Sequence, residues 1–210
     1  SFYIPLFGKE LTLNGEWYYT DFRKQVVVDM DSDPHAVSFY NLDGCSYSNS
    51  FQVEATYPFF RGFTLTAAYR YTDAKTDYRN AESVTRRLKK PLVSDYKGLL
   101  TVSYQTPLKK WQFDLTGQFN GGGRMPTPDA VNPLWKPDFK AYTIVNAQVT
   151  KYFRRWSIYV GAENIFDYKQ PLPIIDAGNP RGDNFDGSMV WGPVHGRKIY
   201  AGLRFNISRD

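Results

Sequence analysis

Acidic residues at alternate positions form the part of the sequence that most resembles a metal site. Asp29, Asp31 and Asp33 have the one-apart spacing of the carboxylates in calcium-binding loops. Pro34 occupies the position at which the EF-hand pattern requires glycine, and no glutamate closes the loop at its twelfth position. The segment therefore predicts either a weak calcium site or a solvated acidic strand end. No other cofactor is expected.

The other residues capable of chemistry do not have the spacing of a catalytic site. Both histidines, His35 and His195, and the single cysteine, Cys45, fall in segments expected to be long loops. One cysteine cannot form a disulfide framework or a cysteine-based zinc site. Glu16 and Glu54 are expected on adjacent strands, where carboxylates normally pair with arginines. We therefore expect a protein that is not an enzyme.

The residues best suited to hold a ligand lie in predicted loops. Aromatic rings there can stack on a ligand, and paired arginines can attract an anionic chelate. Loop packing and a solvated loop face are the alternative roles. The candidates are Tyr40, Trp135, Tyr168, Trp191, Arg86 and Arg87.

Alternation of apolar and polar residues with period two dominates the chain and predicts the elements that position these loops. Between residues 111 and 120, Trp111, Phe113, Leu115 and Phe119 alternate with polar residues, which only a strand separates onto two faces. Helical periodicity is nearly absent, so the sequence predicts an all-β fold. Eight long strands are expected at about 10–30, 46–58, 62–76, 95–106, 110–122, 139–153, 156–167 and 195–208.

The connections between these strands alternate in length. Short turns are expected at 7–10, 58–61, 107–110 and 153–155, and long loops at 31–45, 77–94, 121–138 and 168–194. This alternation predicts an antiparallel up-and-down meander with all short turns at one end. Transmembrane β-barrels of the bacterial outer membrane have this layout, with short periplasmic turns and long extracellular loops.

Composition supports a barrel in a membrane over a soluble β-sandwich, which is the alternative. Aromatic residues make up 17% of the chain, and several, such as Trp17, Tyr57 and Trp111, lie near strand ends, where barrels carry interfacial girdles. Glu54 and Arg70 lie in mid-strand on the polar face, where a sealed core would not hold them unpaired. No apolar run is long enough for a membrane-spanning helix. The net charge of +5 does not indicate binding to nucleic acid.

The C-terminal part of the sequence resembles a known family. Gly161–Asp167 ends with Asn-Ile-Phe-Asp, and a long loop, Gly196-Arg197 and the alternating strand Ile199–Ile207 follow. This combination is similar to the closing segment of TonB-dependent outer-membrane receptors from Bacteroidetes-type bacteria. The resemblance implies uptake of a scarce, bulky nutrient: an iron chelate, haem, cobalamin or a glycan. It also implies extracellular long loops and a periplasmic C-terminus.

The resemblance further implies a barrel of about 22 strands around a plug domain. Eight strands use all 210 residues here, so residues 1–210 are expected to be the C-terminal barrel segment, without the plug and the earlier strands. Ser1–Ile4 resembles the tail of a preceding strand. The implied partners are membrane lipid and lipopolysaccharide, the missing plug and strands, TonB through the absent N-terminal part, the barrel-assembly machinery and a surface lipoprotein. The alternative is a complete eight-stranded barrel that serves as an anchor or adhesin.

The final strand resembles the signal by which the insertion machinery recognises outer-membrane barrels. Tyr200, Gly202, Phe205 and Ile207 fit its spacing of a polar residue, a glycine and two hydrophobic residues. An edge strand is a template for pairing, and Gly202 permits close approach. The tail 208–210 departs from the pattern. A role for Phe205 as a girdle aromatic is the alternative.

Overall fold

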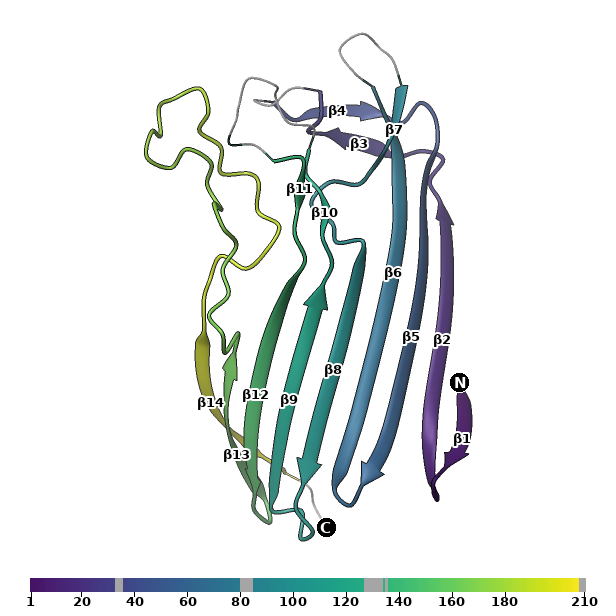
Figure 1. The fold of residues 1–210 in the computed structure, drawn as a ribbon, viewed down its shortest axis with the longest axis vertical. Coiled ribbons are helices and arrows are strands. Elements are labelled where there is room, and N and C mark those ends of the chain that lie inside the picture. Colours follow the sequence, from purple (N-terminus) through teal and green to yellow (C-terminus); the bar gives the residue numbers. More distant parts are fainter. Residues whose placement is uncertain (33–35, 80–84, 127–133, 135, 208–210) are drawn as a thin grey trace.

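The computed structural model describes residues 1–32, 36–79, 85–126, 134 and 136–207, and its regular elements are all strands (Figure 1). A ten-stranded antiparallel sheet has the order β1 (Phe2–Leu6), β2 (Lys9–Asp21), β5 (Ser46–Phe60), β6 (Phe63–Arg79), β8 (Tyr96–Gln105), β9 (Trp111–Asn120), β12 (Tyr142–Tyr152), β13 (Trp156–Glu163) and β14 (Lys198–Phe205), with β7 (Thr85–Lys89) also pairing with β6. Two small hairpins are separate: β3 (Val26–Asp29) with β4 (Ser38–Asn41), and β10 (Gly123–Arg124) with β11 (Asp138–Phe139). Over the described ranges, there is no helix with the length and hydropathy needed to span a membrane.

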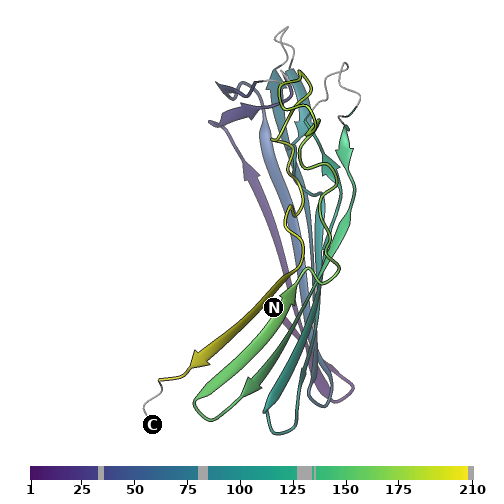
Figure 2. The ribbon, with the colours of Figure 1, turned by 90° about the vertical axis from the view of Figure 1, so that its left-hand side faces the viewer.

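The predicted meander is confirmed. Its eight long strands are β2, β5, β6, β8, β9, β12, β13 and β14, and short turns join β5 to β6, β8 to β9 and β12 to β13 at one end (Figure 1). Ser1–Ile4, expected as the tail of a preceding strand, lies largely in β1, which pairs with β2. The sheet is curved and open, with β1 and β14 at opposite edges (Figure 2). The eight long strands therefore do not close into a small barrel of their own.

Strand register sorts the side chains into an apolar and a polar face, as the alternation predicts. One row on the apolar face contains Leu13, Ala55, Ala67, Leu100, Gly117 and Val145. The adjacent row on the polar face contains Thr12, Thr56, Thr66, Thr101, Thr116 and Asn146. Hydroxyl groups in this row are hydrogen-bonded across strands, Thr56 to Thr66 at 3.2 Å and Thr101 to Thr116 at 3.0 Å. Threonines of the polar face thus hydrogen-bond to one another, whereas the apolar face is suited to a nonpolar environment.

The predicted strand 10–30 is wrong in its second half. β2 ends at Asp21, and the following valines form β3, which pairs with β4 outside the main sheet. Burial alternates from residue to residue along β3. Val27 and Asp29 are 2% and 0% exposed, whereas Val26 and Val28 are open to solvent. The valines therefore do form a strand, but it belongs to a second, smaller sheet.

The predicted loop 77–94 is also partly wrong. β6 continues to Arg79, and β7 pairs with this extension. Arg86 and Arg87, expected on a solvated loop, therefore lie on a strand. Cross-strand pairing of Asp77 with Arg87 explains this strand, because opposite charges directly across an antiparallel ladder stabilise it.

The hydrophobic core among the described residues lies in the loops and not in the sheet. Met125, Phe139, Ile175 and Met189 are buried together at the end of the molecule that carries the long loops. Met30, Leu92 and Trp191 pack against them. Segments from four separate loops thus share one apolar cluster, which holds this end together.

Candidate functional site

The long segment between β13 and β14 folds against the polar face of the sheet and lines an open pocket of about 610 Å³. Figures 1 and 2 show this segment rising from the ends of the two strands beside the upper part of the sheet. The sheet contributes residues of β9 and β12, and the segment contributes His195 and its neighbours. The lining residues are Gln118, Asn120, Tyr142, Ile144, Asn146, Glu163, Asn164, Gly192, Pro193, Val194, His195, Gly196 and Lys198.

The Asn-Ile-Phe-Asp motif forms the first turn of this segment, and its last residue binds the far end of the segment. Asn164 ends β13 with a positive φ of 51°, and its side chain donates to the Tyr168 carbonyl at 2.7 Å and accepts from the Tyr168 N–H at 2.9 Å. Its own N–H donates to the side chain of Asn146 on β12 at 2.9 Å. Asp167 accepts the N–H of Arg197 at 2.7 Å, which joins the two ends of the segment. This N–H, followed by the positive charge of Lys169, lowers the pKa of Asp167. These turns also explain why β13 ends at Glu163, before the predicted boundary.

Gln170 fixes the part of the segment that leads back to β14, and this role was not predicted from the sequence. Its side chain is buried at 4% exposure, donates to the Met189 carbonyl at 2.7 Å and accepts from the N–H groups of Trp191 and Gly192 at 2.8 and 2.9 Å. Its own N–H donates to the Pro193 carbonyl at 2.8 Å. One amide side chain therefore fixes the backbone that carries Trp191.

Two of the predicted ligand-binding aromatics meet at this site. Tyr168 stacks on Tyr142 with ring centroids 5.1 Å apart, and the Trp191 ring is tilted against the same Tyr142 ring with centroids 5.7 Å apart. Trp191 also stacks on Phe139 at 4.9 Å. Tyr142 is the link that sequence spacing could not reveal, because it lies on β12 and joins two residues of a distant segment.

A cation pair lies next to this aromatic cluster on the polar face. Arg70 of β6 and Lys97 of β8 are directly opposite each other in register. Both line a groove of about 330 Å³ that Tyr142 and Trp191 also line. Neither cation forms an ion pair among the residues that the structure describes. Like charges directly opposite destabilise a sheet, so the arrangement favours a bound anion.

Tyr40, another predicted ligand residue, has a place inside the β3–β4 hairpin. Its hydroxyl donates to Asp29 at 2.8 Å and accepts the Arg79 N–H at 2.9 Å. Burial, together with the nearby Asp29 carboxylate, raises the pKa of Tyr40 to about 12. Tyr40 therefore ties the hairpin to the end of β6.

The acidic residues of the calcium hypothesis have protein partners. Asp29 accepts the N–H groups of Asp31 and Ser32 at 2.7 and 3.1 Å, and Asp31 pairs with Arg124 at 2.5 and 2.9 Å. Asp33 lies outside the described residues, and within the described part of the chain no cluster of three potential metal ligands occurs. The calcium hypothesis stays a prediction.

Arg86 and Arg87, among the remaining loop candidates, do not join the aromatic cluster. Arg87 forms a two-point ion pair with Asp77 at 2.8 and 3.0 Å, and this contact lowers the pKa of Asp77. Arg86 is exposed on the same strand, β7. Trp135 lies outside the described residues.

The predicted assembly signal includes two residues with a clear packing role. The rings of Tyr200 and Tyr159 lie over glycines of the opposite strand, because Gly161 is paired with Tyr200, and Gly202 with Tyr159. A Cβ atom would lie 2.3 Å from the Tyr200 ring at Gly161 and 2.2 Å from the Tyr159 hydroxyl at Gly202.

The Tyr200 hydroxyl also donates to Gln148 at 3.0 Å. Phe205 pairs with Trp156 at the end of β14, and both Phe205 and Ile207 are exposed. Recognition by the insertion machinery stays a prediction.

Comparison with known proteins assigns the chain to a family. Residues 2–165 match the model of the family described as TonB dependent receptor-like, beta-barrel. No curated protein matches the chain by sequence.

Solved structures share the fold. A mutant of the ferric enterobactin receptor PfeA from Pseudomonas aeruginosa is 16% identical with a TM-score of 0.62, over 96% of this chain and 29% of that protein. The copper transporter OprC is 14% identical with a TM-score of 0.62, over 94% of this chain and 28% of its own. The ferric-catecholate import receptor Fiu from E. coli is 14% identical with a TM-score of 0.57, over 96% and 26%. The chain thus spans less than a third of each of these proteins.

Proposed function

Because the chain belongs to the TonB-dependent receptor-like β-barrel family, we propose that it forms part of the wall of a transporter that imports a scarce, bulky nutrient. Members of this family are transporters or receptors of the outer membrane. The candidates for the nutrient are an iron chelate, haem, cobalamin or a glycan. Within this set, an anionic ligand such as a ferric chelate fits the site best.

The observation that carries this choice is the pair Arg70 and Lys97 beside the aromatic cluster. The two cations face the same groove as Tyr142 and Trp191. Positive charge in a partly enclosed groove attracts an anionic chelate, and flat aromatic rings can stack on its organic part. A neutral glycan would use the rings but would leave both cations without a partner.

The orientation that we propose for the chain in the outer membrane is the one implied by its family. The apolar face of the sheet contacts lipid, the polar face lines the lumen, the long loops are extracellular and the C-terminus is periplasmic. The partners would be the plug domain and the remaining barrel strands, TonB, the barrel-assembly machinery, lipopolysaccharide at the outer surface and a surface lipoprotein above the loops. No nucleic acid is involved.

The test is uptake in cells that carry the intact protein. Accumulation of ferric chelates, haem, cobalamin and oligosaccharides is measured with and without TonB. Loss of the protein, or of TonB, should abolish accumulation of one class. Unchanged accumulation of every class would contradict a transport function.

The choice of an anionic substrate is tested by substitution. Arg70→Gln with Lys97→Gln should lower uptake at limiting substrate by roughly tenfold, because the groove loses its steering charge. The matched control, Arg23→Gln with Lys75→Gln, removes two cations that already have carboxylate partners. Equal uptake by both double variants would show that the substrate is recognised without the cation pair.

A further inference from the structure

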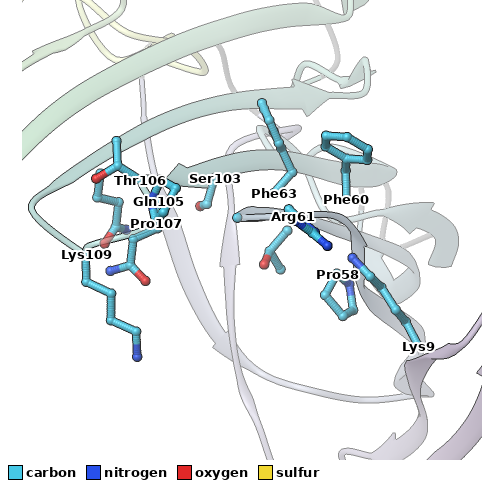
Figure 3. A pocket seen from close by; sticks show the side chains of 13 residues that line it. Lys9, Pro58, Phe60, Arg61, Phe63, Ser103, Gln105, Thr106, Pro107 and Lys109 are labelled. Carbon is cyan, nitrogen blue, oxygen red and sulfur yellow. The ribbon is translucent and has the colours of Figure 1, made fainter.

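The short-turn end of the sheet carries an excess of positive charge. Segments 7–10, 58–61, 107–110 and 153–155 contain six cations and one carboxylate, Glu10. The cations are Lys9, Arg61, Lys109, Lys110, Arg154 and Arg155. In the part of the chain that the structure describes, none of the six forms an ion pair. Figure 3 shows Lys9 and Arg61 on one side of a groove at this end and Lys109 on the other.

Half of the lining of a neighbouring pocket is cationic. This rim pocket, of about 540 Å³, lies between the β8–β9 turn and the β12–β13 turn. Its lining contains no carboxylate. The lining residues are Leu108, Lys109, Lys110, Trp111, Lys151, Tyr152, Phe153 and Arg154.

The charges of the rim pocket lie beside apolar surface. Lys151 belongs to the apolar face, opposite Trp111 in register, and its Nζ lies 4.8 Å from the Trp111 ring centroid and 5.3 Å from that of Phe153. Trp111 and Phe153 are each 39% exposed, and Leu108 is 75% exposed. A cation above aromatic rings that are open to the surroundings is typical of a membrane interface, where the stem is buried and the head reaches the polar layer.

Backbone hydrogen bonds join the two turns to each other and hold the shape of the β8–β9 turn. The Tyr152 N–H donates to the Lys110 carbonyl at 2.8 Å, and the Lys109 N–H donates to the Thr106 carbonyl at 2.7 Å. Phe153 also stacks on Trp156 with ring centroids 3.9 Å apart. The positions of the rim-pocket cations are therefore set by paired strands and tight turns.

We propose that the rim pocket binds the headgroup of an anionic phospholipid, with its phosphate on Lys109, Lys110 and Arg154 and its acyl chains along Trp111 and Phe153. Clusters of lysine and arginine at a membrane surface attract anionic lipid, and the apolar wall selects a lipid over a small anion. The inference relies on the proposed placement of the apolar face in lipid. It does not depend on which nutrient is transported.

The experiment is a titration of the purified intact protein in neutral detergent with phosphatidylglycerol, with phosphatidylcholine as the neutral lipid. Bound lipid is counted by native mass spectrometry. Lys109→Gln, Lys110→Gln and Arg154→Gln together should weaken phosphatidylglycerol binding at least about tenfold, since each surface cation contributes roughly fivefold. The matched control, Lys9→Gln, Arg61→Gln and Arg155→Gln, removes the same charge outside the rim pocket and should weaken binding clearly less than the rim-pocket variant does.

Three results would overturn the proposal. Equal losses in the two triple variants would show a diffuse charge effect, and unchanged binding in the rim-pocket variant would show that lipid binds elsewhere. Competition by glycerol phosphate at the lipid's own concentration would reveal an anion site without lipid selectivity. Nutrient uptake by the same variants is a separate measurement, so loss of lipid binding with normal uptake leaves the transport proposal intact.

Discussion

The two ends of the sheet use their charges in opposite ways. At the long-loop end, several cations form ion pairs with carboxylates: Arg87 with Asp77, Arg124 with Asp31, and Lys89 with Asp95. At the short-turn end, six cations lie on the turns, and none is paired over the described ranges. The first arrangement joins loops to one another. The second leaves charge available to a partner outside the chain.

The difference follows from what each end must do. Long loops have too little regular structure to hold their own shape, so buried side chains such as Asp29 and Gln170 provide the missing hydrogen bonds. Short turns are held by the strands they connect and need no such support. Their side chains are therefore free to meet the membrane surface.

The largest expected effect concerns the apolar and polar faces of the strands that run between these two ends. Leu115→Arg places a charge on the apolar face of β9 and should hinder insertion, at a cost of roughly 2–4 kcal/mol near the membrane midplane. Thr116→Arg places the same charge on the polar face and should be tolerated. The amount of heat-modifiable protein in outer-membrane fractions measures both. Equal assembly of the two variants would refute the assignment of the faces.

A smaller effect is expected from the glycines beneath the tyrosine rings near the C-terminus. Gly161→Val should displace the Tyr200 ring and break its hydrogen bond to Gln148, which lowers stability by roughly 1–3 kcal/mol. Gly15→Val is the matched control, because a side chain at this strand position meets nothing within 4 Å. Thermal unfolding of the intact protein, followed by loss of heat-modifiability on gels, should separate the two variants.

Gln170 tests whether the long-loop end depends on single buried contacts. Gln170→Leu removes three side-chain hydrogen bonds and leaves the N–H groups of Trp191 and Gly192 without acceptors, at a cost of about 1–3 kcal/mol locally. The segment 189–192 should become sensitive to protease on intact cells. Gln118→Leu, which changes a β9 residue that lines the pocket beside this segment and removes none of these bonds, should stay resistant.

The smallest expected effect is a pH dependence of the β6–β7 extension. Arg87 lowers the pKa of Asp77, so the pair stabilises the extension above the ordinary pKa of an aspartate, and the contribution disappears as the pH falls through the lowered value. Because Arg87 is half-exposed, solvent screening keeps this contribution small. Asp77→Asn removes the carboxylate charge, so at neutral pH this variant should lack the same stabilisation that the unsubstituted protein loses only in acid. Hydrogen exchange of 85–89 would measure this, and identical exchange at pH 7 in both proteins would contradict it.

Local pattern predicted the sheet well and the site less well. Alternation predicted the two faces, because apolar and polar residues alternate along each strand according to the face on which they lie. The loop lengths predicted the topology. Arg70 and Lys97 could not be paired in advance, since their opposition depends on the register of two strands. Tyr168 and Trp191 were recognised singly, but their meeting at Tyr142 depends on how a long segment folds back. Arg87 was predicted on a loop and lies on a strand, because the pairing of β7 with β6 that places it opposite Asp77 leaves no apolar alternation in the charged sequence.

Labelling of single cysteines on intact cells tests most directly whether the two ends face different compartments. In a cysteine-free background that includes Cys45→Ser, one variant carries Arg86→Cys at the long-loop end and the other Lys110→Cys on a short turn. A membrane-impermeant thiol reagent should label the first variant in intact cells, and the second only after the outer membrane is permeabilised. Labelling of the Lys110→Cys variant in intact cells, with protection of the Arg86→Cys variant, would contradict the proposed orientation.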